Sequence, residues 1–284
     1  MSRPSKPETP RYLAATLLLD RPWSLDVDRL AKRLKNRFPG LGSVDALPGQ
    51  TAGDTGLLMI DRARVVLQSI DNAIEPDAAV PPLKILRTWD PGAALEVHKA
   101  QISVSCGGRL PGIEGAQAYS AATHFVTAAL ADLVRPQAVL WGAARHLIEP
   151  SVFSCSADAL LQGQLPYTVW VSFAPVIPEG TDGSVTGMVS YGLRPFIGHE
   201  LELAPRPGGA QDAYRCLAAV VRRVMNDRVS LSEGMRMIDR QANIELRVRE
   251  RRYWLRRNET AFVLASEDSV IDPDTLRPRD REVA

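Results

Sequence analysis

Several features that would place a protein in a class are missing from this chain of 284 residues. It has three cysteines, Cys106, Cys155 and Cys216. They are odd in number and lack metal-ligand spacing, so we expect neither a disulfide framework nor a cysteine metal site. No apolar run approaches the roughly 20 residues that a membrane-spanning helix needs. The 34 basic and 33 acidic side chains leave a formal charge of +1, which gives no reason to expect a general nucleic-acid binder or a membrane-surface protein.

The motifs of common catalytic and metal sites are missing as well. There is no H-E-x-x-H, H-x-H or C-x-x-C pattern, so spacing predicts no metal site and no cofactor. There is also no G-x-S-x-G nucleophile elbow and no kinase signature. The start, "MSRPSKPETPR", is polar and proline-rich without the apolar core of a signal peptide. We expect a cytoplasmic protein whose residues 1–10 are disordered.

The first ninety residues predict a sheet packed against one helix. "RYLAATLLLD" (11–20) is an almost continuous apolar run, typical of a strand buried on both faces. Ser24 is expected to cap a helix with one apolar stripe. That stripe consists of Val27, Leu30, Ala31, Leu34 and Phe38. "GLLMIDRARVVLQSI" (56–70) is two apolar runs around a polar turn and indicates a hairpin.

A similar order of elements recurs farther along the chain. Helical periodicity marks 116–134 and 212–227. Strands are expected over 96–106, 137–143, 167–176, 184–193 and 199–203. This order predicts an α+β fold with two similar β-α-β-β(-β) units, for which a ferredoxin-like duplication is one arrangement, plus a C-terminal β-ribbon. The expected division is a first unit over 11–92, a second over 93–228, a ribbon extension over 229–268 and a flexible tail over 269–284.

The C-terminal ribbon combines basic and aromatic residues. Arginines between Arg247 and Arg257 surround Trp254, and such a combination can bind single-stranded nucleic acid by stacking and charge. The alternative is a solvated ribbon whose arginines are paired with its glutamates. Because the whole chain is nearly neutral, the second interpretation is favoured and nucleic acid is an unlikely partner.

The stretch "HKAQISVSCGGRLPG" (98–112) looks most like an active site. On an extended strand His98 and Cys106 share a face but are eight residues apart, roughly 26 Å at about 3.3 Å per residue. A nucleophile and its base must lie about 3 Å apart, so Cys106 is interpreted as a core residue. The glycines around Arg109 could offer backbone N–H groups to an anion, although a turn between a strand and a helix needs glycine anyway.

Two further sets of residues are candidates for a binding site. Glu200 and Glu202 alternate on one strand, about 6.7 Å apart. They could bind a divalent ion or act as an acid/base pair, but a charged outer face on an edge strand is the favoured interpretation. Trp141, Trp170 and Trp254 are candidate anchors of a protein interface. The Trp170 side chain shares a predicted strand face with polar residues, which suits an interface, although a covering helix layer is an equal alternative.

Five segments, in order, resemble a family of bacterial proteins known only as a domain of unknown function. They are "HKAQISVSC" (98–106), "AVLWGAARHLIEPSVF" (138–153), "VWVSFAP" (169–175), "TGMVSYGLRPFIGHELEL" (186–203) and "LSEGMRM" (231–237). The clearest mark of the family is a G-M-x-x-x-G…E-L-E-like strand pair, matched loosely by Gly187, Met188, Gly192 and 200–202. The resemblance spans roughly residues 12–237 and carries no catalytic residue set. It implies a cytoplasmic protein, with some members near secretion or toxin–immunity genes.

These observations favour a non-enzymatic protein-binding protein, such as an immunity protein or an accessory factor of a bacterial toxin or type VI secretion system. Its partner would be a toxin, a secretion component or a second copy, bound through Arg109, Trp170, Glu200, Glu202 or Trp254. One alternative is an enzyme of unknown reaction with a site near Arg109, His98 or Glu200 and Glu202. The other is nucleic-acid binding through the basic ribbon.

Overall fold

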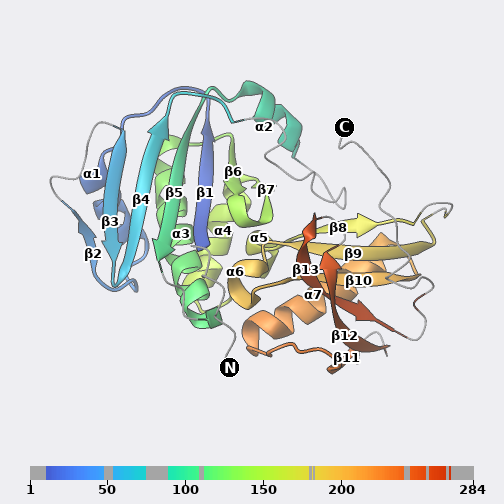
Figure 1. Ribbon diagram of the computed structural model, residues 1–284. Coiled ribbons are helices and arrows are strands. Elements are labelled where there is room, and N and C mark those ends of the chain that lie inside the picture. The colour runs from blue at the N-terminus through green and yellow to red at the C-terminus, as the bar shows by residue number, and fades with distance from the viewer. Residues whose placement is uncertain are drawn as a thin grey trace. The chain divides into compact units, whose positions relative to one another are not determined.

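A computed structural model describes residues 11–47, 54–74, 89–108, 112–178, 181, 183–239, 244–253, 256–266 and 269. Within them the chain forms two compact units, drawn in Figure 1. The first unit takes the described residues up to 74 and those within 91–142 and 149–161. The second takes residues 89–90, 143–148 and the described residues from 162 onward. Helices and strands are mixed in both units, so the predicted α+β class is confirmed.

The first unit is an antiparallel sheet with helices on one face. Its strands follow the order β2-β3-β4-β5-β1-β6, and each neighbouring pair is antiparallel. The strands are β1 (Arg11–Leu19), β2 (Val44–Ala46), β3 (Thr55–Ile60), β4 (Ala63–Ile70), β5 (Ala100–Gly108) and β6 (Ala138–Trp141). The helices are α1 (Val27–Arg37), α2 (Pro91–Val97), α3 (Gly112–Val134) and α4 (Pro150–Leu161). Helices α1, α3 and α4 lie behind the sheet in Figure 1.

Alternation along the strands creates the core of this unit. Leu13, Ala15 and Leu17 of β1 are fully buried, whereas the intervening Ala14 and Thr16 are only half-buried. Buried side chains therefore meet the helical layer, as expected for an antiparallel sheet with one covered face. The predicted apolar stripe of α1 is confirmed.

The first turn of α1 differs from its prediction. The cap is Asp26 rather than Ser24, because the Asp26 carboxylate accepts a hydrogen bond from the Arg29 N–H at 2.9 Å. This bond satisfies one of the N–H groups that the first turn of a helix leaves without a partner.

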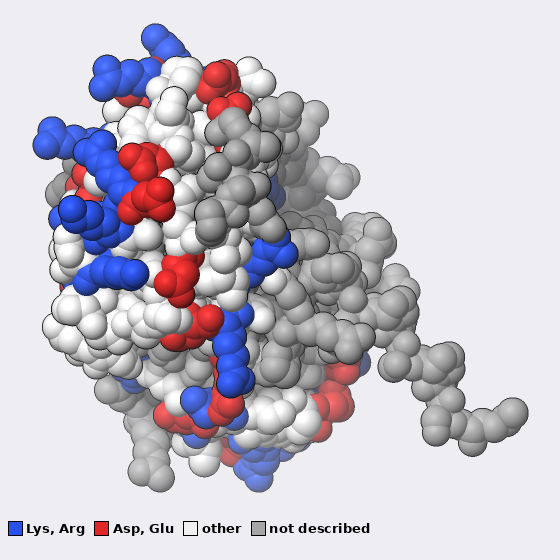
Figure 2. All heavy atoms as spheres, turned by 90° about the vertical axis from the view of Figure 1, so that its left-hand side faces the viewer, with Lys and Arg blue, Asp and Glu red and all other residues white. Residues whose placement is uncertain are grey.

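On the side seen in Figure 2, lysine and arginine side chains are interspersed with aspartate and glutamate side chains, and no single charge sign dominates.

The division of the chain differs from the expected boundary between residues 92 and 93. Strand β5 pairs with both β1 and β4, so it completes the first sheet instead of opening a second one. Strand β6 extends the same sheet by pairing with β1. Pairing between strands about 90 or more residues apart along the chain is not visible in local periodicity, which explains the difference.

The second unit has its own sheet, with the order β11-β12-β13-β10-β9-β8. Strands β10 and β13 are parallel and the other described pairs are antiparallel. The strands of this sheet are β8 (Ser172–Val176), β9 (Val185–Tyr191), β10 (Glu200–Pro207), β11 (Arg236–Asp239), β12 (Ile244–Tyr253) and β13 (Arg256–Ala265). The unit also contains the short strand β7 (His146–Ile148), which is not part of this sheet. The helices are α5 (Tyr167–Trp170), α6 (Arg194–Ile197) and α7 (Ala210–Asn226). Tyr214 of α7 meets Phe173 of β8 edge-on, with ring centroids 5.3 Å apart.

Three expectations about this unit are corrected or left open. The predicted ribbon extension is an integral part of the sheet, because β13 pairs in parallel with β10. The strand predicted over 167–176 begins only at Ser172, since 167–170 form the short helix α5 after Pro166. The predicted duplication is not confirmed: the first unit's pairs are all antiparallel, whereas the second sheet contains a parallel pair. Among the described residues, no helix is long and apolar enough to cross a membrane.

Candidate functional site

Two of the five predicted binding residues, Arg109 and Trp254, lie outside the described residues. A third, Trp170, occupies a place different from the one predicted. It is the last residue of α5 and is fully buried, stacked on the ring of Phe196 with centroids 5.7 Å apart. Trp141 is fully buried too. The prediction that Trp170 lies on a strand is therefore wrong, because residues 167–170 form a short helix instead.

The remaining two predicted residues, Glu200 and Glu202, lie on β10 in the interior of the second sheet. Strand β10 is flanked by β13 and β9, and the two glutamates are only 7% and 8% exposed. An edge strand with a charged outer face was expected here, and that interpretation is wrong. A buried carboxylate is costly unless it accepts hydrogen bonds, so its partners decide its role.

The Glu200 carboxylate accepts four hydrogen bonds from one turn of the chain. The Ser190 hydroxyl donates to Oε2 at 2.7 Å, and three consecutive backbone N–H groups complete the set. These are Gly192 to Oε1 at 2.9 Å, Leu193 to Oε2 at 3.1 Å and Arg194 to Oε1 at 3.2 Å. Ser190 Oγ also accepts from the Leu201 N–H at 2.8 Å. Glu200 therefore ties the turn that begins α6 to the centre of the sheet.

Two opposing effects act on this carboxyl group. Burial raises the pKa of Glu200 above its ordinary value, while the hydrogen bonds from Ser190, Leu193, Arg194 and Gly192 lower it. Both oxygens face donors that belong to the fold. The arrangement holds a turn in place and leaves Glu200 poorly suited to bind an outside ion with Glu202.

The turn also explains why glycine occupies position 192. Its φ angle is +97°, and a Cβ built there would lie 2.5 Å from the Trp170 carbonyl oxygen and 2.9 Å from the Ala144 Cβ. A side chain at this position would meet both the left-handed backbone penalty and a backbone clash. The loosely matched glycine of the family resemblance therefore has a packing role here.

His98 is one of the residues considered for the enzyme alternative, and it also serves the fold. It lies between α2 and β5 and not on a strand, so the strand predicted over 96–106 begins only at Ala100. Its Nδ1 lies 2.7 Å from the Leu95 carbonyl oxygen, and its Nε2 accepts the Ile74 N–H at 2.8 Å. The carbonyl requires a proton on Nδ1 and the N–H requires a lone pair on Nε2, so the neutral Nδ1–H tautomer fits both. With both nitrogens engaged and the residue 4% exposed, His98 is a structural link.

Cys106 lies in the core of the first sheet, as interpreted from the strand pattern. It is fully buried, and burial raises the pKa of its thiol to about 11. Cys216 is buried as well, whereas Cys155 is exposed on α4.

Because the thiolate is the reacting species, a maleimide reagent is expected to modify only Cys155 in the native protein. Intact-mass spectrometry should show one adduct at neutral pH and three after unfolding; rapid native labelling of Cys106 would contradict its burial.

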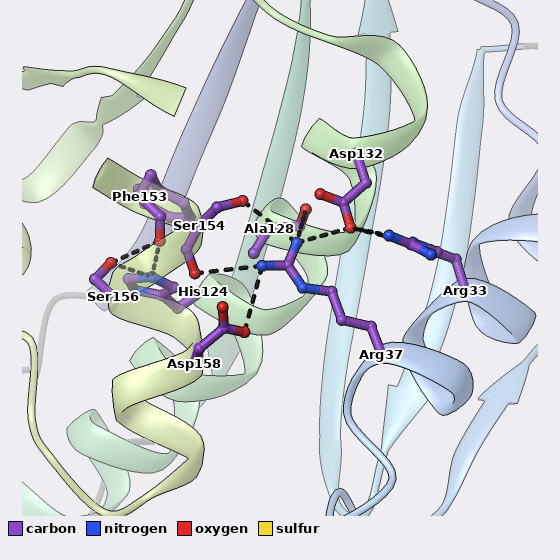
Figure 3. A network of polar contacts seen from close by, with 9 residues as sticks. All are labelled: Arg33, Arg37, His124, Ala128, Asp132, Phe153, Ser154, Ser156 and Asp158. Carbon is purple, nitrogen blue, oxygen red and sulfur yellow. Dashed lines mark hydrogen bonds and ion pairs between the residues drawn. The ribbon is translucent and has the colours of Figure 1, made fainter. Parts of the chain in front are cut away.

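A polar cluster between helices of the first unit was not predicted. Figure 3 shows Arg37 of α1 at its centre, directed toward side chains and carbonyl groups of α3 and α4. Its guanidinium group lies 2.7 Å from Asp132 Oδ2 and 3.4 Å from Asp158 Oδ1. It donates to the carbonyl oxygens of Ala128 at 3.1 Å and Ser154 at 3.3 Å. One side chain, 13% exposed, thus bonds to both neighbouring helices.

His124 forms the inner part of this cluster. It is fully buried on α3, stacked on the Phe153 ring with centroids 4.0 Å apart. Its Nε2 lies 2.9 Å from Ser156 Oγ and 3.2 Å from the Phe153 carbonyl oxygen, as Figure 3 shows. A serine and a histidine at this distance resemble a nucleophile and its base.

The third bond of this group argues against that chemistry. The Ser156 hydroxyl donates its one proton to the Phe153 carbonyl oxygen at 2.7 Å. The carbonyl can only accept, so His124 Nε2 fits as a donor to both oxygens and has no lone pair for the serine proton. The bond from Ser156 to the carbonyl three residues earlier is a common local bond in helices. The cluster joins α3 to α4 without an activated nucleophile.

The buried His124 should make stability depend on pH. Burial lowers its pKa to about 3; the bond to the Phe153 carbonyl opposes this shift and the Arg37 charge adds to it. In the unfolded chain this histidine has a pKa near 6.5. Below that pH the unfolded state therefore binds more protons than the folded state. The stability that follows from this difference in pKa is fully present above pH 6.5 and is lost as the pH falls toward 3. At pH 5 the free energy of unfolding is lower by about 2 kcal/mol.

Urea unfolding at pH 7.5 and pH 5 measures this effect. The His124→Gln variant should lose about 2 kcal/mol less on acidification than the wild type. Glu200 and His146 are common to both proteins, so their own responses to pH cancel in the comparison. Equal losses in the two proteins would show that His124 is accessible to protons in the folded state.

The comparisons with known proteins give no family for this chain. No protein-family model, no curated protein and no solved structure matches it. Within the part of the chain that the structure describes, no group of three or more histidine, cysteine, aspartate or glutamate side chains could hold a metal ion.

Proposed function

We propose that this chain is a non-enzymatic protein-binding protein that uses the sheet faces opposite its helices. The observation that carries the proposal is the front face of the first sheet. Helices α1, α3 and α4 lie on the other side (Figure 1). The central row of the front face is Ala14, Ser105 and Val66, which are paired across three strands and half-buried. The next row is Thr16, Ser103 and Gln68.

Such a face suits contact with another protein surface. Its side chains are short, lie on hydrogen-bonded neighbouring strands and mix apolar with hydroxyl and amide groups. Interfaces of this kind need little side-chain ordering, because small residues lose few rotamers on binding. An antiparallel sheet can also keep this face in water before a partner arrives.

The buried polar groups support the same proposal. His98, His124 and Glu200 were the residues best suited by type to acid–base chemistry, and each is bonded to backbone groups of its own unit. Their hydrogen-bonding capacity stabilises the fold.

The sequence resemblance extends the proposal to a particular kind of binding protein. It favours a bacterial, cytoplasmic immunity protein or an accessory factor of a toxin or secretion system. The partner would then be the toxin, a secretion component or a second copy of this chain. An enzyme with a site near Arg109 remains the alternative from another class.

Affinity capture of the tagged protein from its own host, at native expression levels, tests the proposal. Wild type should retain one stoichiometric protein, identified by mass spectrometry. Ser105→Arg, which places a long charged side chain on the front face, should release it. Lys32→Glu, an exposed charge change on the helical side, should not. Thermal unfolding of both variants shows whether they are folded, and recovery of the wild type without any protein partner would contradict the proposal.

A further inference from the structure

Arginines line one face of β12 in the second unit. Because successive strand residues point to opposite faces, Arg247, Arg249 and Arg251 share a face. Arg236 of β11 is paired directly with Arg247 and therefore lies on that face too. We call these four residues the arginine face. Strands β11 and β12 are the two outermost on one side of the sheet, as Figure 1 shows.

The other side of the same strands is packed into the core. Met237, Leu246 and Val248 are buried, and α7 lies on that side, where Phe173 meets Tyr214. The arginine face thus points away from α7. Arg236, Arg247 and Arg249 are exposed and Arg251 is half-buried. Ile238, paired with Glu245 on the same face, is 58% exposed.

This arrangement concentrates positive charge at some cost to the fold. Like charges at directly paired strand positions are destabilising, and Arg236 stands opposite Arg247. Glu245 offsets part of the cost through its hydrogen bonds with Arg236. Those bonds lower the pKa of Glu245, and the charges of Arg236 and Arg247 lower it further. An anionic partner would offset the rest of the repulsion.

The geometry points to an extended acidic polypeptide segment as the occupant of the arginine face. Arginines at alternate strand positions recur about every 6.7 Å, and carboxylates at alternate residues of an extended peptide recur at the same spacing. The planar guanidinium group can bind each carboxylate with two hydrogen bonds. Ile238 provides an apolar contact at one end of the row.

The described side chains favour a peptide over nucleic acid. Single-stranded nucleic acid is held by stacking on aromatic side chains as well as by charge. None of Arg236, Ile238, Glu245, Arg247, Arg249 and Arg251 is aromatic. A carboxylate-bearing segment needs only the bonds that arginine supplies. This inference rests on the proposed protein-binding function and names the chemistry of the partner.

A titration with defined probes tests the inference. The probes are a fluorescein-labelled peptide in which glutamate alternates with valine, the same peptide with glutamine for glutamate, and an oligothymidylate. Wild type should bind the glutamate peptide, with affinity that falls as salt rises. The double variant R247Q/R249Q should bind about tenfold more weakly. Arg215→Gln is the matched control, an exposed arginine on α7, on the other side of this sheet.

Each other outcome overturns the inference in a recognisable way. Tighter binding of the oligothymidylate would assign the face to nucleic acid. Equal binding of the two peptides, or equal weakening by Arg215→Gln, would show that the arginine face is not the site. Absence of binding to every probe would also overturn it, while a partner captured equally by wild type and R247Q/R249Q would leave the protein-binding function standing.

Discussion

Replacing Glu200 by glutamine is expected to lower the free energy of unfolding by about 3 kcal/mol. Glutamine has nearly the same shape, so the variant tests hydrogen bonding more than packing. Its amide offers one acceptor oxygen. Its NH₂ group would face the N–H donors of Gly192 and Arg194 in place of Oε1, or that of Leu193 in place of Oε2. Buried donors would lose their acceptor, and this loss costs more than an average hydrogen bond contributes. Urea unfolding at pH 7 followed by circular dichroism measures the effect.

Two further variants show whether the four-bond arrangement is the cause. Ser190→Ala removes one donor to Glu200 and the acceptor of the Leu201 N–H, and it should cost about 2 kcal/mol, less than Glu200→Gln. Glu250→Gln changes an exposed glutamate on β12 and should leave stability almost unchanged. If Glu200→Gln were no more destabilising than Glu250→Gln, the buried carboxylate would not organise the turn.

Replacing Arg37 by methionine is expected to destabilise the first unit by about 2–3 kcal/mol. Methionine keeps much of the aliphatic length and removes the guanidinium group. The carbonyl oxygens of Ala128 and Ser154 and the carboxylates of Asp132 and Asp158 would each lose a donor. Because Arg37 is 13% exposed, solvent replaces only part of what is lost. Thermal and urea unfolding of the purified variant give the size of the effect.

Arg33 provides the matched control for this prediction. It lies on the same helix and contacts the same oxygen, Asp132 Oδ2, at 2.6 Å. Its side chain is 43% exposed, so Arg33→Met should cost less than about 1 kcal/mol. Arg37→Lys keeps the charge but not the planar set of donors, and it should fall between the two. Similar losses for Arg33→Met and Arg37→Met would mean that the charge on Asp132, and not the bridge between helices, matters.

Much of the local structure follows from patterns within one segment. The apolar stripe of α1 and the alternation along β5 depend on neighbours a few residues apart, and both were predicted. The division into units depends on the pairing of β5 with β1 and β4. That pairing joins distant segments, and no single-segment period contains it.

The candidate residues show the same limit. Alternation placed Glu200 and Glu202 on one strand correctly, but it cannot distinguish an edge strand from a central one. For Trp170, β-branched neighbours on both sides indicated a strand, whereas Pro166 starts a helical turn through bonds to its carbonyl oxygen. Arg37 and Asp132 are 95 positions apart in the sequence, so nothing in the sequence around either residue indicates their contact.

In-host photocrosslinking tests the central claim, that this chain binds another protein, at the arginine face of the second sheet. A photoreactive phenylalanine derivative replaces Ile238, which is exposed on that face and leaves its four arginines in place, and replaces Arg215 in the control. The account predicts one adduct at position 238, containing another protein with an acidic segment at the crosslink, and none at position 215. Adducts of equal intensity at both positions, a nuclease-sensitive adduct, or no adduct at position 238 would contradict it.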